Sequence, residues 1–173
     1  MALDATVAGK NANSYVTRAV ADTFFTAGMH PKSGTWSTLT ANQKDEYLIA
    51  ATEHIDMQRL QGVKNDPAID TDGLPKQRLH FPRPQDDESG TKYIPLAVKE
   101  ATYMQAIFLA TRGSGHDTRE NLQSDGVSSV SIGDVSESYD LAGSKSPRSL
   151  LSKESRGKLW RDGLLIDSGR VKV

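Results

Sequence analysis

The sequence predicts a mainly α-helical protein: a small helical bundle with a long proline-rich crossover loop, a short β-hairpin, and an extended C-terminal arm that carries a short helix. Three segments repeat apolar residues at helical spacing, and four of the seven prolines fall within 62–94. Nine serines and five glycines then fall within 113–146. These observations predict three regions: a helical core domain over 1–113 that contains the 62–94 loop, a Gly/Ser-rich loop or hairpin over 114–146, and a C-terminal helix and tail over 147–173.

Composition limits the class of protein. The chain has 173 residues, 36% of them hydrophobic, which suits one domain with a modest core. The net charge of −1 provides no global field toward nucleic acid or an acidic membrane. Cysteine is absent, which excludes disulfides and thiolate zinc sites. Because no apolar run approaches the roughly 20 residues of a membrane span and residues 1–15 do not resemble a signal peptide, we expect a soluble protein made in a reducing cytoplasm, with no membrane partner.

The first predicted helix begins after Thr17, which has a side chain suited to an N-cap, and ends at Gly28, which can adopt the left-handed conformation of a helix stop. Its apolar face is expected to contain Val20, Phe24 and Ala27. A helix of about three turns depends on tertiary packing for its stability.

The second predicted helix begins at Thr40, and Gln43 completes the spacing of a capping box. Leu48, Ala51 and Ile55 recur at helical spacing and predict its buried face. Neither proline nor glycine follows until residue 62.

The third predicted helix begins near Pro95, a residue that suits the first helical position, and ends at Gly113. One face is expected to contain Ala97, Ala101, Met104 and Phe108. Small side chains on this helix would let another helix approach closely.

Between the second and third helices, the stretch QRLHFPRP at 77–84 combines large apolar residues with prolines. A solvated linker does not need large apolar residues, and a helix or central strand does not tolerate these prolines. We therefore predict a structural wedge in which Leu79 and Phe81 lie on the helical core and prolines hold the following chain extended. The predicted wedge consists of Leu79, Phe81, Pro82 and Arg83.

After the third helix, the segment 128–140 predicts a short hairpin with Gly133 and Asp134 at its turn. A short helix is then expected from about Ser152 to Arg161. Trp160 has two interpretations: it packs this helix on the chain's own core, or it anchors the arm to another protein. The candidate interface residues of the second interpretation are Leu150, Leu151, Arg156, Leu159, Trp160 and Arg161.

The sequence gives little indication of catalysis or cofactor binding. The stretch 68–73 lacks two oxygen ligands of a calcium loop and favours an Asx-type turn. The four histidines have no metal-ligand spacing, and the acidic run 86–88 is interpreted as a solvated loop. We therefore expect no enzyme, no catalytic residues, no cofactor and no metal site.

Several short motifs resemble the phage head–tail connector, or adaptor, proteins, many of which carry the label DnaT-like single-stranded DNA-binding protein. The family's element is Gln-x-Leu-x-aromatic-Pro-Arg, followed by Ile-Pro and an alanine-rich helix. In this sequence the matching residues are Gln77, Leu79, Phe81, Pro82, Arg83, Ile94 and Pro95. The family more often has tryptophan where this chain has Phe81. The resemblance covers roughly residues 13–162.

The resemblance implies a virion structural protein of the phage neck, at the head–tail interface. Its subunits would form a ring, typically twelve-fold, that binds the portal protein and extends the DNA channel. The implied partners are the portal protein, neighbouring copies of the chain, a downstream tail or stopper protein and, transiently, passing double-stranded DNA. Segments 62–94 and 113–173 would then gain burial against adjacent subunits.

The alternative function is single-stranded nucleic-acid binding, which combines a basic groove with exposed aromatic platforms. Phe24, Tyr47 and Phe108 fall at predicted core positions, which favours the structural ring component instead. From Asp140 onward, however, eight Lys and Arg face four acidic residues, a net charge of +4. This basic end would suit either DNA or an acidic portal surface.

Overall fold

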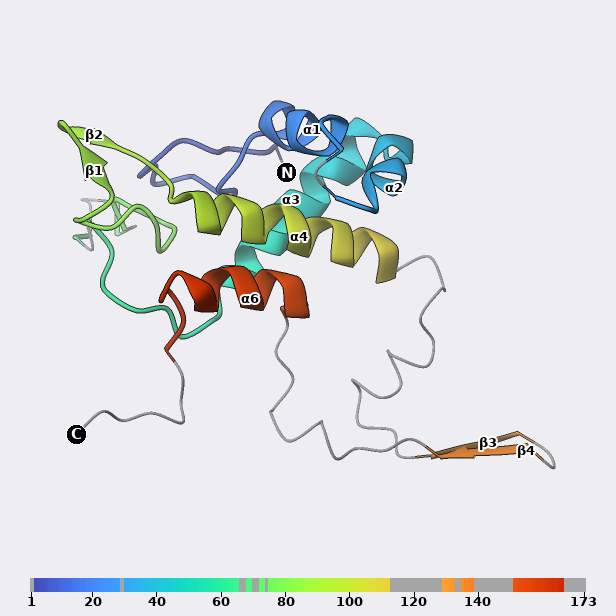
Figure 1. Ribbon diagram of the computed structural model, residues 1–173. Helices are drawn as coiled ribbons and strands as arrows, with labels where there is room; N and C mark the ends of the chain where they lie inside the picture. The colour runs from blue at the N-terminus through green and yellow to red at the C-terminus, as the bar shows by residue number, and fades with distance from the viewer. Residues whose placement is uncertain are drawn as a thin grey trace, which may run out of the picture. The chain divides into compact units, whose positions relative to one another are not determined.

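The computed structural model describes residues 2–28, 30–65, 68–69, 72–73, 75–112, 129–132, 135–138 and 151–166. This part of the chain contains five helices and two antiparallel two-stranded hairpins (Figure 1). The helices are α1 (Arg18–Thr26), α2 (Ser33–Thr38), α3 (Ala41–Asp56), α4 (Leu96–Arg112) and α6 (Lys153–Arg161). The chain divides into two units, one of residues 1–110 with 151–173 and one of residues 111–150. The predicted mainly helical fold is confirmed.

The ends of α1 are as predicted, but its buried face is not. The Thr17 side chain accepts a hydrogen bond from the Val20 amide, and Gly28 has a φ of +69°. The buried residues are Ala21 and Phe25, whereas Val20 is 47% exposed. Of the predicted face, Phe24 is half-buried and packs on the core, but Val20 and Ala27 are exposed, because the helix packs where Phe25 finds an aromatic partner outside α1.

That partner is Trp36 of α2, a helix that the sequence did not predict. The six residues of α2 include glycine, serine and threonine, which are weak helix formers. Trp36 is 2% exposed, and its ring stacks on Phe25 with 4.6 Å between the centroids. Its Nε1 donates to the carboxylate of Asp22 at 2.8 Å. Tertiary packing around one tryptophan therefore stabilises this helix.

The predictions for α3 are confirmed. Thr40 and Gln43 form both hydrogen bonds of a capping box. The predicted face of Leu48, Ala51 and Ile55 is fully buried. The helix ends at Asp56, because Met57 forms its C-cap and the chain then leaves the helical path.

The helix α4 lies at the centre of the first unit. Every residue from Ala101 to Ile107 is buried, so the helix is covered on more than the one face that was predicted. Tyr103 stacks on Phe24 of α1 with 4.5 Å between the centroids, and burial, aided by the charge of Glu100, raises the pKa of Tyr103 to about 12. Phe108, expected on the buried face, is only half-buried.

The loop between α3 and α4 folds back on its own chain. Gln77 is fully buried, and its Nε2 donates to the carbonyl oxygens of Leu79 at 2.9 Å and Pro82 at 2.7 Å. The chain does not continue extended after Pro82 as predicted. A turn forms instead, because the Asp86 carboxylate accepts from the Arg83 amide at 2.8 Å and the Asp86 amide donates back to the Arg83 carbonyl. Asp86 is therefore buried, whereas Asp87 and Glu88 are solvated as expected.

Two hairpins are present in the described parts of the chain. The first, not predicted, pairs β1 (Asp87–Glu88) with β2 (Thr91–Lys92) through Ser89 and Gly90, which both have positive φ. The second pairs β3 (Ser129–Ile132) with β4 (Val135–Ser138), and its register leaves two residues, 133 and 134, between the strands. This confirms the predicted hairpin, although its turn residues, like Gly113, lie outside the described residues.

Replacing Phe81 by alanine is expected to lower the free energy of unfolding by about 3–5 kcal/mol, because it leaves a cavity in the core. The side chain is 1% exposed. Urea denaturation followed by circular dichroism measures this change. Tyr93→Ala is the control, since Tyr93 is 42% exposed and its loss should change stability by about 0.5 kcal/mol or less. A loss below about 1 kcal/mol for Phe81→Ala would show that the wedge does not stabilise the fold.

Candidate nucleic-acid interface

The C-terminal helix α6 is fixed on α4 by buried polar contacts. Ser152 caps α6, and its amide donates to Oε1 of Gln105 at 2.8 Å. The Ser155 hydroxyl donates to the Ala101 carbonyl at 3.0 Å, which brings the two helices close together at a small residue of α4. Lys158 pairs with Glu100 at 2.5 Å. Because such bonds are directional, they fix the rotation of α6 about its own axis as well as its position. Figure 1 shows α6 beside α4.

This rotation determines which side of α6 faces solvent. Ser155 and Leu159 are fully buried, whereas Trp160, one residue later, is 64% exposed. We define the outer face of α6 as five exposed residues at helical spacing: Lys153, Arg156, Gly157, Trp160 and Arg161. Glu154, which is also exposed, borders this face on the side of the groove described below. The face therefore combines three cations with one indole ring.

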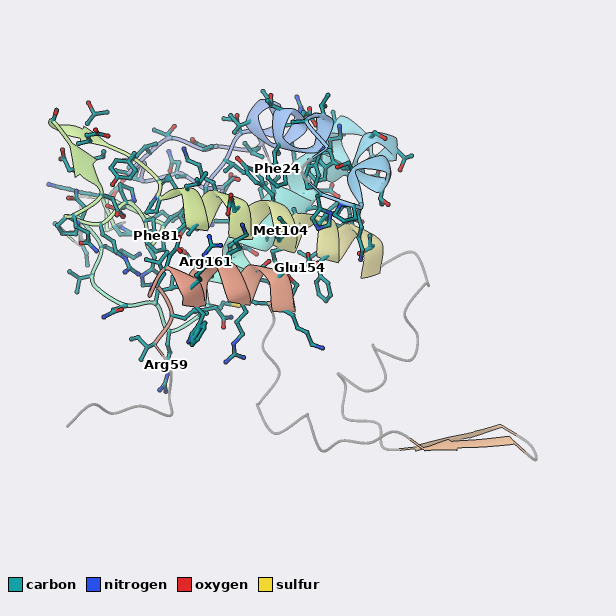
Figure 2. All side chains as sticks on the ribbon, viewed as in Figure 1. Phe24, Arg59, Phe81, Met104, Glu154 and Arg161 are labelled. Atoms are coloured by element: carbon teal, nitrogen blue, oxygen red, sulfur yellow. The ribbon has the colours of Figure 1, made fainter. Side chains whose placement is uncertain are left out.

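A shallow groove runs beside the outer face. Its floor includes Met104 of α4, and its far wall is formed by His30 and Pro31, which precede α2. Figure 2 shows Met104 on α4 and, toward opposite ends of α6, Glu154 and Arg161. His30 and Glu154 are joined across the groove at 3.1 Å. The full lining is His30, Pro31, Met104, Lys153, Glu154, Gly157, Lys158 and Arg161.

The charges around the groove favour an anionic ligand. Three cations line it, of which Lys158 is paired with Glu100, and the single carboxylate among its lining residues, Glu154, contacts His30. Among the described residues, neither Lys153 nor Arg156 forms an ion pair, and Arg161 pairs with its exposed neighbour Asp162 at 3.3 Å. Phosphate groups are ligands of this charge, and Lys and Arg are the side chains that bind them most often.

An isolated antiparallel bridge between Leu60 and Leu165 brings Arg59 toward the end of α6. The Ile166 amide donates to the Arg59 carbonyl, and the Gln61 amide donates to the Leu164 carbonyl, both at 2.9 Å. Figure 2 shows Arg59 beyond the C-terminal end of α6. The sequence analysis missed Arg59, because its proximity depends on a pairing between segments about a hundred residues apart.

The structure separates the residues predicted for an interface into two groups. Leu151 and Leu159 belong to the chain's own hydrophobic core, at 6% and 0% exposure, so their apolar surface is not available to another protein. Arg156, Trp160 and Arg161 are exposed. Leu150 lies outside the described residues. The interpretation of Trp160 as a core residue was wrong, because Leu159 occupies the core position instead. The role of Trp160 as an anchor to another protein stays a prediction.

The predicted wedge residues Leu79, Phe81, Pro82 and Arg83 are all buried. Phe81 meets Tyr15 edge-on with 5.8 Å between ring centroids. The guanidinium carbon of Arg83 lies 4.2 Å from the centroid of the Phe81 ring, which is cation–π geometry. The wedge therefore fastens the loop to the core, and its burial indicates a structural role.

A buried polar cluster holds the wedge in place. The Tyr15 hydroxyl donates to the Asp56 carboxylate, and the His80 amide donates to the same group at 3.2 Å. Burial, followed by the Asp56 charge, raises the pKa of Tyr15 well above its usual value. Burial also raises the pKa of Asp56 and lowers the pKa of His80. The cluster links the N-terminal segment, α3 and the loop.

Among the described residues, no group of three or more side chains is arranged to bind a metal ion. In the stretch 68–73, Asp72 pairs with Lys10 at 2.8 Å, and Asp70 lies outside the described residues. His54 contacts Gln105 through Nδ1 at 3.0 Å.

None of the helices in the described part of the chain is both long and apolar enough to cross a membrane.

The fold and the outer face of α6 define a small helical protein with an exposed indole ring among cations at the surface of its C-terminal helix. The family described as "Putative DnaT-like ssDNA binding protein" matches residues 1–158, and the chain belongs to this family. The match ends within α6, so Trp160 and Arg161 lie beyond it. No curated protein and no solved structure matches the chain. The DnaT-like part of the predicted resemblance is thus supported, whereas no comparison supports a head–tail adaptor.

Replacing Leu159 by alanine is expected to lower the free energy of unfolding by about 2–5 kcal/mol, because its fully buried side chain would leave a cavity. Trp160→Ala, at the adjacent position, is the matched control and should change stability by about 0.5 kcal/mol or less. Chemical denaturation of both variants measures the difference. Equal losses, or a larger loss for Trp160→Ala, would contradict the observed rotation of α6.

Proposed function

We propose that the protein binds single-stranded DNA through the outer face of α6. The observation that carries this proposal is the placement of Lys153, Arg156 and Arg161 around the exposed indole of Trp160. Single-strand binders combine cations that follow the phosphate backbone with aromatic rings on which bases stack. The description of the chain's family supports the same function.

In this proposal the two kinds of side chain have separate tasks. The cations neutralise phosphates and release counterions, so binding weakens as salt increases. The Trp160 ring offers a stacking surface to any base, which gives affinity with little sequence preference. The overall charge of −1 does not oppose this function, because the eight cations and four acids from Asp140 onward concentrate positive charge in the C-terminal part of the sequence.

The affinity of the unmodified chain and its variants for oligothymidylate tests the proposal. Trp160→Ala should weaken binding by about 1–3 kcal/mol, the value of one stacked base. Arg156→Ala should lower the slope of log K against log salt by about 0.7, the contribution of one phosphate contact on a single strand. Fluorescence anisotropy at several salt concentrations measures both effects.

Two exposed residues of other elements provide matched controls. Tyr93→Ala removes an aromatic ring and Lys92→Ala removes a cation, and both side chains are exposed. Neither substitution should change affinity or salt slope. The proposal would be overturned by an unmodified chain that does not bind oligothymidylate, or by control variants that lose as much affinity as the α6 variants.

A second candidate function, a head-to-tail adaptor subunit in the neck of a tailed phage, is favoured by exposed apolar side chains. Met57, Val63, Ile69 and Leu96 are between 67% and 71% exposed. Apolar side chains such as these become more favourable when another protein removes them from water. We propose for this case a ring, typically twelve-fold, between neighbouring copies, the portal protein and a tail or stopper protein, through which double-stranded DNA passes.

Mass measurement distinguishes this second candidate. An adaptor should form complexes of ring size when mixed with a portal ring, and replacing Met57 and Leu96 by serine should reduce their assembly without unfolding the chain, since both residues are exposed. Native mass spectrometry measures assembly, and circular dichroism checks the fold. A chain that stays monomeric with the portal would exclude the adaptor.

A further inference from the structure

A glycine lies in the middle of the outer face of α6, where the chain's own packing does not require one. Gly157 is the fifth of nine helical residues. A Cβ atom added there would meet no other heavy atom within 4 Å, and its φ is not in the left-handed region. Neither a close intramolecular contact nor the backbone conformation therefore explains the absence of a side chain.

Helix energetics also disfavour glycine at this position. In a helix interior, glycine is less favourable than alanine, because it loses more backbone freedom on folding. The cost matters more in a nine-residue helix, which has little intrinsic stability. Close approach of another molecule to the backbone is one of the uses of glycine, and the open space at Gly157 would permit it.

The neighbours of Gly157 indicate the chemistry of that molecule. Lys153 lies one turn before it and Arg161 one turn after it on the same face, while Trp160 lies three residues further along. Gly157 also lines the groove beside α6. The bare strip of helix backbone is thus bordered by two cations, one aromatic ring and the carboxylate of Glu154, which contacts His30.

We propose that Gly157 is the point at which the sugar–phosphate backbone of single-stranded DNA crosses α6 in van der Waals contact with the helix backbone. This inference rests on the proposed function and adds the path of the strand. Lys153 and Arg161 bind phosphates on the two sides of the crossing, and Trp160 stacks on a base beside it. Charge complementarity selects this occupant, since the cations at both ends of the strip are spaced along one helix face.

Substitution at Gly157 should change stability and affinity in opposite directions. Gly157→Ala should raise Tm by about 2–4 °C, because alanine favours the helix and its methyl group meets open space in the free protein. The same variant should bind oligothymidylate at least about fivefold more weakly, the low end of the cost of adding a methyl group to a close contact. Gly157→Leu should weaken binding further.

Asn42→Ala is the control, an exposed position on α3 where alanine also favours the helix. It should leave affinity unchanged, which separates loss of contact from stabilisation itself. If Gly157→Ala and Gly157→Leu bind as tightly as the unmodified chain while Trp160→Ala and Arg156→Ala bind weakly, the crossing at Gly157 is wrong and the proposed function stands. An unmodified chain that does not bind oligothymidylate overturns both.

Discussion

The hydrogen bonds from Ser152 and Ser155 to α4 are the interaction on which the candidate site depends. They bury polar groups that would be costly to leave unpaired, so the two helices have one favourable alignment rather than a range of them. A helix places successive side chains about 100° apart, and the alignment therefore decides that Leu159 enters the core and Trp160 faces solvent. The same rotation exposes Lys153, Arg156 and Arg161 to solvent. A hydrophobic contact alone would leave this rotation less well defined.

A second polar arrangement orders the loop before α4. The loop does not follow a helical path, so its backbone groups need other hydrogen-bond partners. Asp56 accepts from the His80 amide and the Tyr15 hydroxyl, and the Gln77 side chain donates to the Leu79 carbonyl. Gln77, Leu79 and residues 81–83 are consequently buried within their own chain. This weakens one argument for a ring, because the unusual composition of the loop has an explanation inside the monomer.

Features set by neighbouring residues were predictable from the sequence. The capping box of Thr40 and Gln43, the N-caps Thr17 and Ser152 and the stop at Gly28 depend on a few adjacent residues. Features set by tertiary contacts were not. The buried face of α1 and the existence of α2 follow from the stacking of Phe25 on Trp36, and the proximity of Arg59 to α6 follows from a pairing of distant segments. The exposure of Trp160 depends on bonds to α4 that no spacing within α6 reveals.

Hydrogen–deuterium exchange with and without oligothymidylate tests the central claim most directly, because it locates the ligand without altering a side chain. We predict that the amides of residues 155–161, which follow the unpaired first amides of the helix, exchange slowly in the free protein and more slowly still with DNA, and that the added protection in the described part of the chain is greatest there. Protection elsewhere with no change in α6 would place the DNA on another surface. Rapid exchange across α6 in the free protein would show that the helix is not held on α4 and that its outer face is not a fixed site.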